Sequence, residues 1–149
     1  MSRFDDAMRA FERGNFRRAA ALFSAAIDQG ECVAAAFSKR GVCRFKWGDV
    51  AQAEADFRAA LAADDRCVSA MVNLGNLMLE RGELNEAQVC YERAIRFDDT
   101  YALAHHNLGV LLRKRGDLSG SIRELRLAGK LETKLRRSSR GWNLRKKGS

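Results

Sequence analysis

The chain has 149 residues, a formal net charge of +8 at pH 7 and no proline. No apolar run reaches the roughly 20 residues that span a bilayer, and the first residues lack the charged and then apolar layout of a secretion signal. The four cysteines have no CxxC spacing, so free buried thiols are expected and a metal or disulfide framework is not. We therefore expect a single domain in the cytoplasm.

Amphipathic helices separated by single glycines are predicted along most of the chain. The first two hairpins pair helices over about residues 2–13 with 15–29, and 34–47 with 49–63. Each predicted helix start lies near a side chain that can accept hydrogen bonds from the first turn. These side chains are Ser2, Asn15, Asp49, the pair Asp64–Asp65 and the pair Asp98–Asp99.

The helical hairpin recurs with a fixed period. The glycines between the two helices are Gly14, Gly48, Gly82 and Gly116, and their differences (48−14, 82−48 and 116−82) are each 34 residues. The second helices keep the same register, with Ala19, Ala53, Ala87 and Ser121, then Phe23, Phe57, Tyr91 and Leu125, then Ala26, Ala60, Ala94 and Ala128. An internal repeat of this length predicts a solenoid whose hairpins bury their apolar faces against each other.

This pattern resembles the tetratricopeptide repeat (TPR) over about residues 3–135. The resemblance implies an all-α, right-handed α-solenoid of four 34-residue helix-turn-helix repeats, at about residues 1–33, 34–67, 68–101 and 102–135. The proline that the family carries after the second helix is replaced by Glu31, Asp65, Asp99 and Thr133. Leu127, Leu131 and Leu135 are spaced by four, which predicts that the last helix continues past Thr133 as a capping extension. Residues 136–149 are expected to form a basic, flexible tail.

In this family the first helices of successive repeats line a concave surface, which implies a groove for a peptide or helix of another protein. By register the groove would contain Phe4, Met8, Phe11, Ser38, Lys39, Val42, Phe45, Val72, Asn73, Asn76, Leu79, Leu103, His106, Asn107, Val110 and Arg113. Phe11, Phe45 and Leu79 hold the same position in consecutive repeats. They can form an apolar stripe for a partner, or they can pack on neighbouring helices as ordinary structure.

No catalytic site, cofactor, metal or small-molecule substrate is predicted. The only histidines, His105 and His106, are adjacent on a helix and point in different directions, and His105 takes the place of a core aromatic residue in the TPR pattern. No nucleophile–base pair or glycine-rich phosphate loop accompanies them. One TPR subtype binds chaperone C-terminal carboxylates through Lys, Asn and Arg. Asn76 and Asn107 match its amide positions, but Val72 stands where its first lysine would be.

Two residues depart from the positions that other repeats share. Trp47 occupies a site that holds arginine in the other repeats, so it either anchors a partner or folds over its own repeat. Arg40 replaces the leucine found at Leu74 and Leu108, and Asp56 lies on the facing helix. We predict an Arg40–Asp56 salt bridge that stabilises the fold.

The C-terminal residues 130–149 carry eight basic groups and one acid, a net of +7, whereas the remaining 129 residues carry a net of +1. The tail residues involved are Arg136, Arg137, Arg140, Trp142, Arg145, Lys146 and Lys147. The favoured function is a non-catalytic adaptor that binds a partner protein in the groove. The alternative is an electrostatic tether whose tail binds nucleic acid, an anionic membrane or an acidic protein, and self-association is a third possibility. A solubilising role for the tail remains open.

Overall fold

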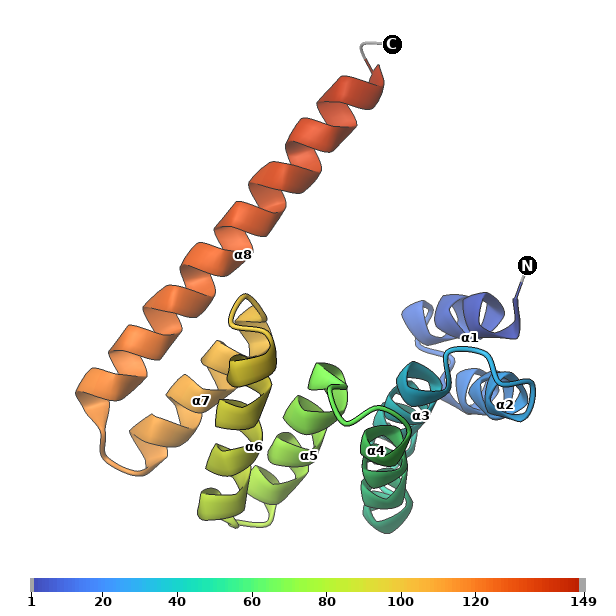
Figure 1. The fold of residues 1–149 in the computed structure, drawn as a ribbon, viewed down its shortest axis with the longest axis horizontal. Helices are drawn as coiled ribbons and strands as arrows, with labels where there is room; N and C mark the ends of the chain where they lie inside the picture. The colour runs from blue at the N-terminus through green and yellow to red at the C-terminus, as the bar shows by residue number, and fades with distance from the viewer. Residues whose placement is uncertain (1, 148–149) are drawn as a thin grey trace. The chain divides into compact units, whose positions relative to one another are not determined.

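The computed structural model describes residues 2–147, with side chains described for residues 2–140, and it forms two compact units, Met1–Cys90 and Tyr91–Ser149. All regular secondary structure in the described residues is α-helical, as predicted (Figure 1). The helices are α1 (Arg3–Glu12), α2 (Phe16–Asp28), α3 (Val33–Lys46), α4 (Val50–Ala63), α5 (Val68–Glu80), α6 (Leu84–Phe97), α7 (Ala102–Lys114) and α8 (Leu118–Lys147).

The four periodic glycines form the turns between paired helices. Gly14, Gly48, Gly82 and Gly116 have φ angles of +76°, +89°, +77° and +87°. Only glycine adopts this left-handed conformation without a steric cost, and it ends the preceding helix by redirecting the chain. The 34-residue period of the sequence is therefore the period at which the backbone must turn.

Three of the predicted helix caps are confirmed. The side-chain oxygens of Ser2, Asn15 and Asp49 accept hydrogen bonds from backbone N–H groups three residues later, at 3.1, 3.3 and 3.2 Å.

The prediction that aspartate pairs cap α5 and α7 is wrong. These helices begin at Val68 and Ala102, after Cys67 and Tyr101, and neither residue makes a side-chain cap. Asp64 and Asp98 lie too far before the helices and accept instead from the N–H groups of residues two positions later, at 3.0 Å. These aspartates fix the loops between hairpins rather than the helix ends.

Small residues allow the helices of the first unit to approach closely. One cluster of its buried core is built mainly from alanines on α1, α2 and α3. Helix α2 packs on α3, which packs on both α4 and α5. A Cβ atom on Gly41 would lie 2.5 Å from Cε1 of Phe57. The glycine in α3 is thus required by the ring of α4 that packs against it.

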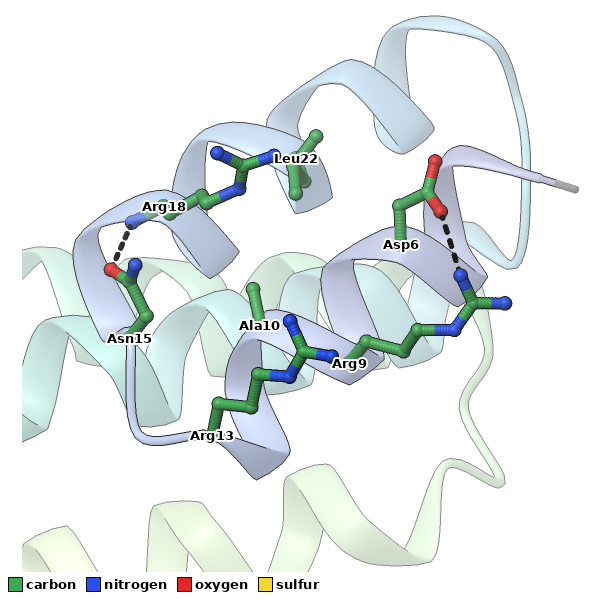
Figure 2. A pocket seen from close by; sticks show the side chains of 7 residues that line it. All are labelled: Asp6, Arg9, Ala10, Arg13, Asn15, Arg18 and Leu22. Atoms are coloured by element: carbon green, nitrogen blue, oxygen red, sulfur yellow. Dashed lines mark hydrogen bonds and ion pairs between the residues drawn. The ribbon is translucent and has the colours of Figure 1, made fainter.

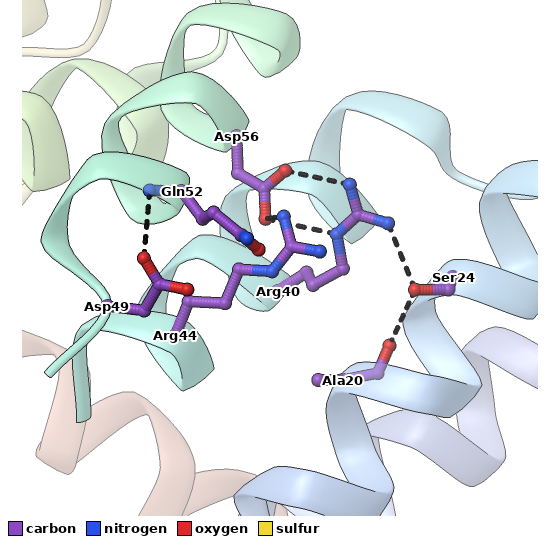
Figure 3. Close-up of polar contacts among 7 residues, drawn as sticks. All are labelled: Ala20, Ser24, Arg40, Arg44, Asp49, Gln52 and Asp56. Atoms are coloured by element: carbon purple, nitrogen blue, oxygen red, sulfur yellow. Dashed lines mark hydrogen bonds and ion pairs between the residues drawn. The ribbon is translucent and has the colours of Figure 1, made fainter. Parts of the chain in front are cut away.

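The predicted Arg40–Asp56 salt bridge is confirmed, and it belongs to a larger network (Figure 3). Arg40 donates from Nη2 to Oδ1 of Asp56 at 2.8 Å and from Nε to Oδ2 at 3.0 Å. Arg44 donates to the same carboxylate at 2.9 Å, and Arg40 also reaches Oγ of Ser24 at 2.9 Å. Because Asp56 is only 2% exposed, these bonds hold α2, α3 and α4 together around a buried charge.

In the second unit, α7 packs on the first part of α8. His105 is 3% exposed; its Nδ1 lies 2.7 Å from Oε2 of Glu124 on α8, and its Nε2 lies 2.8 Å from the carbonyl oxygen of Asp99. His105 thus sits in the core, as the TPR pattern implies, and bridges the loop before α7 to α8. Both ring nitrogens therefore lie within hydrogen-bonding distance of an oxygen atom.

The last helix differs from the prediction in its length. Figure 1 shows α8 as one straight helix whose second half extends past α7. It continues beyond Thr133, as predicted, and on to Lys147, where the sequence indicates no regular structure after Arg137. No proline interrupts this segment, and its arginine, lysine and leucine residues have good helix propensity. Leu127 and Leu135 stay 38% and 69% exposed.

The cysteines are free thiols, but the expectation that they are buried is wrong for Cys32, which is exposed. Cys43 is fully buried in the core, and this burial raises the pKa of its thiol to about 11. No helix in the described part of the chain is long and apolar enough to cross a membrane.

Candidate functional site

The first helix supplies aromatic side chains to the predicted groove, and all are half-buried. Phe4 packs on Phe23 of α2 with ring centroids 5.8 Å apart. Phe11 meets Phe16 and Phe23 edge-on, at 5.6 and 6.4 Å. Each ring therefore contributes to the α1–α2 core and keeps part of its surface exposed. Phe11 therefore packs on neighbouring side chains as ordinary structure, and the exposed part of its ring is available to a partner.

The next first helix, α3, joins this surface through a charged residue. The Lys39 ammonium lies 4.9 Å from the centroid of the Phe11 ring, within the range of a cation–π interaction. Val42 and Phe45 are half-buried on the same helix. The first two helices of the predicted groove thus meet at Phe11 and Lys39, and each keeps apolar side chains partly exposed.

A hydrogen-bond network links α3 to α5. The Asn73 Nδ2 donates to Oγ of Ser38 at 3.2 Å, and the hydroxyl groups of Ser38 and Ser69 lie 3.2 Å apart. The helices themselves also pack together. Asn73 therefore fixes the orientation of α5 relative to α3, in addition to any contact with a partner. Asn76 and Leu79 are half-buried farther along α5.

Two predicted groove residues are not accessible. Ser38 and Val72 are 1% and 0% exposed. Ser38 lies between α3 and α5, and α5 carries buried residues around most of its circumference. Assigning groove residues by their position in the repeat is wrong for these two residues, because a helix inside the stack packs on more than one side. Neither side chain can contact a partner directly.

The predicted residues of the fourth repeat lie on α7, in the second unit. Leu103 is 46% exposed, His106 and Arg113 are exposed, and Asn107 and Val110 are half-buried. Their participation in one groove with α1, α3 and α5 stays a prediction. The helices α1, α3 and α5 belong to the first unit, and we call their exposed side the first-helix surface.

Trp47 and its counterpart Arg81 both pack on the preceding hairpin. The Arg17 guanidinium of α2 lies 4.1 Å from the Trp47 ring centroid, and Arg81 pairs with Glu54 of α4 at 2.9 Å. The tryptophan thus neither stands free nor folds over its own repeat alone. In the sequence, these contacts could have been indicated by comparing the residue at the end of each repeat's first helix with the residues on the second helix of the repeat before it.

A cavity of about 660 Å³ between α1 and α2 was not predicted. Figure 2 shows its lining, in which Arg9 comes from α1, Arg13 directly follows α1, and Arg18 comes from α2. Asp6 pairs with Arg9 at 3.5 Å. Three arginines and one carboxylate give it a net positive charge that suits a small anion. The signal in the sequence is the spacing of Arg9 and Arg13 by four, which places both on one side of a helix.

The predicted basic tail lies on α8. Arg136, Arg137 and Arg140 are exposed there. The side chains of Trp142, Arg145, Lys146 and Lys147 fall outside the residues whose side chains are described. Among the described residues, no group of three or more His, Cys, Asp or Glu side chains could hold a metal ion.

Comparison with known proteins identifies the family. One tetratricopeptide repeat model matches residues 4–66 and a second TPR repeat model matches residues 75–116. The chain belongs to the tetratricopeptide repeat family, as the sequence resemblance indicates. No curated protein sequence gives a significant match to it.

Solved structures share the fold at low sequence identity. The crystal structure of MamA matches with a TM-score of 0.71 and 17% identity, over 91% of this chain and 79% of that chain. TTC0263, a thermophilic TPR protein of Thermus thermophilus, gives a TM-score of 0.78 and 20% identity, over 88% of this chain and 73% of that one. The first TPR of Spaghetti (RPAP3) bound to an HSP90 peptide gives 0.69 and 19%, over 76% and 90%. These likenesses establish the TPR solenoid fold for this chain.

Proposed function

We propose that this protein is a non-catalytic adaptor that binds a peptide or helical segment of another protein on its first-helix surface. TPR proteins are generally adaptors of this kind, and one structural neighbour is bound to an HSP90 peptide. The observation that carries the proposal is the set of apolar side chains on three successive first helices that keep exposed area after the unit has packed. They are Phe4, Met8, Phe11, Val42, Phe45 and Leu79.

The chemistry of this surface favours an apolar segment with an acidic residue. The half-buried rings and aliphatic groups offer contact area for apolar side chains, and Lys39 beside Phe11 supplies a positive charge. The carboxylate-binding arrangement of the chaperone-binding subtype receives little support, because Val72 replaces its first lysine and is buried. The proposed ligand is therefore held mainly by internal side chains rather than by a C-terminal carboxylate.

Site-specific photo-crosslinking tests the proposal. A photoreactive amino acid at Val42 is expected to crosslink a partner protein in lysate, whereas the same group at the exposed Ala55 on α4 serves as the matched control. A band that forms from position 42 and not from position 55 supports the proposal. Equal labelling from both positions, or crosslinking only to a second copy of the chain, contradicts the proposed role of this surface.

A further inference from the structure

The net charge of the protein resides entirely in α8. This helix carries ten basic residues and two acidic ones, a net of +8, and the rest of the chain carries 17 of each, a net of zero. The basic region therefore begins within the part of α8 that packs on α7, earlier than the tail indicated by the sequence. A charge this concentrated dominates the electrostatic field around the second unit.

Five cations lie along one side of α8, and we call them the basic stripe: Arg123, Arg126, Lys130, Lys134 and Arg137. Their spacings of 3, 4, 4 and 3 residues place them within an arc of about 80° on the helix surface, over a length of about 21 Å. All five are exposed. No ion pair involves any of them within the described residues.

The acidic residues of α8 lie away from the basic stripe. Glu124 points toward α7, where it contacts His105 at 2.7 Å, and Glu132 lies about 160° around the helix from the centre of the stripe. Uncharged residues flank the cations instead, with the exposed Ile122 and Leu127 beside Arg123, Arg126 and Lys130. Gly129 and Thr133 help to line a hollow of about 690 Å³ beside Lys130 and Lys134. A bulky anion can therefore approach the stripe without displacing a protein carboxylate.

We infer that the basic stripe binds the phosphate backbone of a nucleic-acid duplex, independently of the peptide-binding function. Five cations without ion pairs over a length of about 21 Å are best matched by a row of anions of similar length. A duplex offers one negative charge per roughly 1.7 Å of its axis, whereas a folded protein rarely presents such an array. Arginine and lysine contact phosphate without reading the base sequence, so affinity without strong sequence preference is expected.

A bilayer fits the second unit less well. Membrane-bound amphipathic helices bury a continuous apolar face beside their basic residues. On α8 the exposed apolar side chains directly beside the stripe are Ile122 and Leu127. Leu131 and Leu135 instead line a hollow of about 560 Å³ together with Tyr101 and Leu103. The loop before α7 thus stands beside these leucines and hinders α8 from lying flat on lipid.

Fluorescence anisotropy with the full chain and a labelled DNA or RNA duplex of about 24 base pairs, longer than the roughly 45 Å helix, tests the inference. Binding should weaken with salt. Lys130→Gln combined with Lys134→Gln should lower affinity about tenfold or more and reduce the slope of log K against log salt by about 1.8, the value for two lost phosphate contacts. The matched control, Lys114→Gln combined with Arg136→Gln, removes the same charge from outside the stripe and should change affinity less than about threefold.

Circular dichroism should show equal helicity for both double variants. Equal loss of affinity in the two would overturn the inference, because binding would then follow net charge rather than the stripe. Failure of both the DNA and the RNA duplex to bind at low salt would also overturn it. So would stripe-dependent binding of vesicles containing anionic lipid, or of poly-glutamate, at affinities above those for the duplexes, since the partner would then be a membrane or an acidic protein.

Discussion

Removal of the Asp56 carboxylate should destabilise the first unit strongly. In Asp56→Ala, the two arginines that donate to this 2% exposed group lose their shared acceptor. Breaking a buried ion pair costs about 3–5 kcal/mol. Because the Arg40 and Arg44 side chains are 16% and 22% exposed, part of their charge can rehydrate, so we expect roughly 3 kcal/mol, at the lower end of that range.

Urea denaturation followed by circular dichroism measures this loss as a change in the free energy of unfolding. In a unit of this size it corresponds to a decrease in Tm on the order of 15 °C. Glu54→Ala is a suitable control, because its carboxylate is 23% exposed and its pairs with Arg58 and Arg81 lie near the surface. That change should cost only about 0.5 kcal/mol.

The double variant Arg40→Leu/Asp56→Ala separates burial of charge from loss of contacts. Repeats three and four have leucine at the position of Arg40, so an apolar residue suits this site. Removing both charges should be less destabilising than Asp56→Ala alone, since less unpaired charge remains buried. The reasoning is refuted if Asp56→Ala unfolds within about 0.5 kcal/mol of wild type, or if the two single effects simply add.

Three further changes test local packing and ionisation. Gly41→Ala should cost about 2 kcal/mol in urea denaturation, because the new Cβ forces the buried Phe57 ring to move; wild-type stability would show that the ring gives way freely. Near pH 8, a thiol reagent should modify Cys32 rapidly and Cys43 only after unfolding, since burial raises the Cys43 pKa to about 11; fast modification of both in the native state would contradict this. Burial raises the pKa of Glu54, but hydrogen bonds from Arg58 and Arg81 outweigh this effect and lower the pKa overall. The stabilisation from these ion pairs is therefore present above the pKa of the unfolded state and is lost as the pH falls through the pKa of the folded state. The stability difference between wild type and Glu54→Gln should therefore disappear in acid, and a difference that grows there would reverse the sign of the argument.

The periodic elements of this fold could be predicted because each requirement is local or repeats in register. A turn with positive φ needs glycine at Gly48 and Gly82, and a charged residue at the leucine position of a repeat needs a partner on the facing helix, as Arg40 has in Asp56. The sequence alone could not show that Arg44 shares this carboxylate, because the residues at its position in the other repeats do not indicate a partner for it. It also could not show that Val72 is buried, since burial of α5 depends on how many helices pack around it.

The candidate site was predicted less well than the fold. The apolar positions on α1 and α3 were identified by register, but the core role of Phe11 required the positions of Phe16 and Phe23. At the C terminus, the glycine and serine content after Arg137 indicated irregular structure, whereas helix propensity and the absence of proline let α8 continue. The basic stripe became visible only with this helix, because Arg123 and Arg126 lie outside the segment indicated by charge.

The most direct test of the adaptor function compares three baits in capture from nuclease-treated lysate: wild type, Val42→Arg, and the stripe variant Lys130→Gln/Lys134→Gln. Val42→Arg places a charge within the first-helix surface, and its Tm must match that of wild type for the comparison to hold. We predict that wild type and the stripe variant retain the same protein that crosslinks at position 42, and that Val42→Arg loses it. Retention of that protein by Val42→Arg would contradict a partner-binding role for the first-helix surface, and its loss from the stripe variant would show that the partner binds α8 instead.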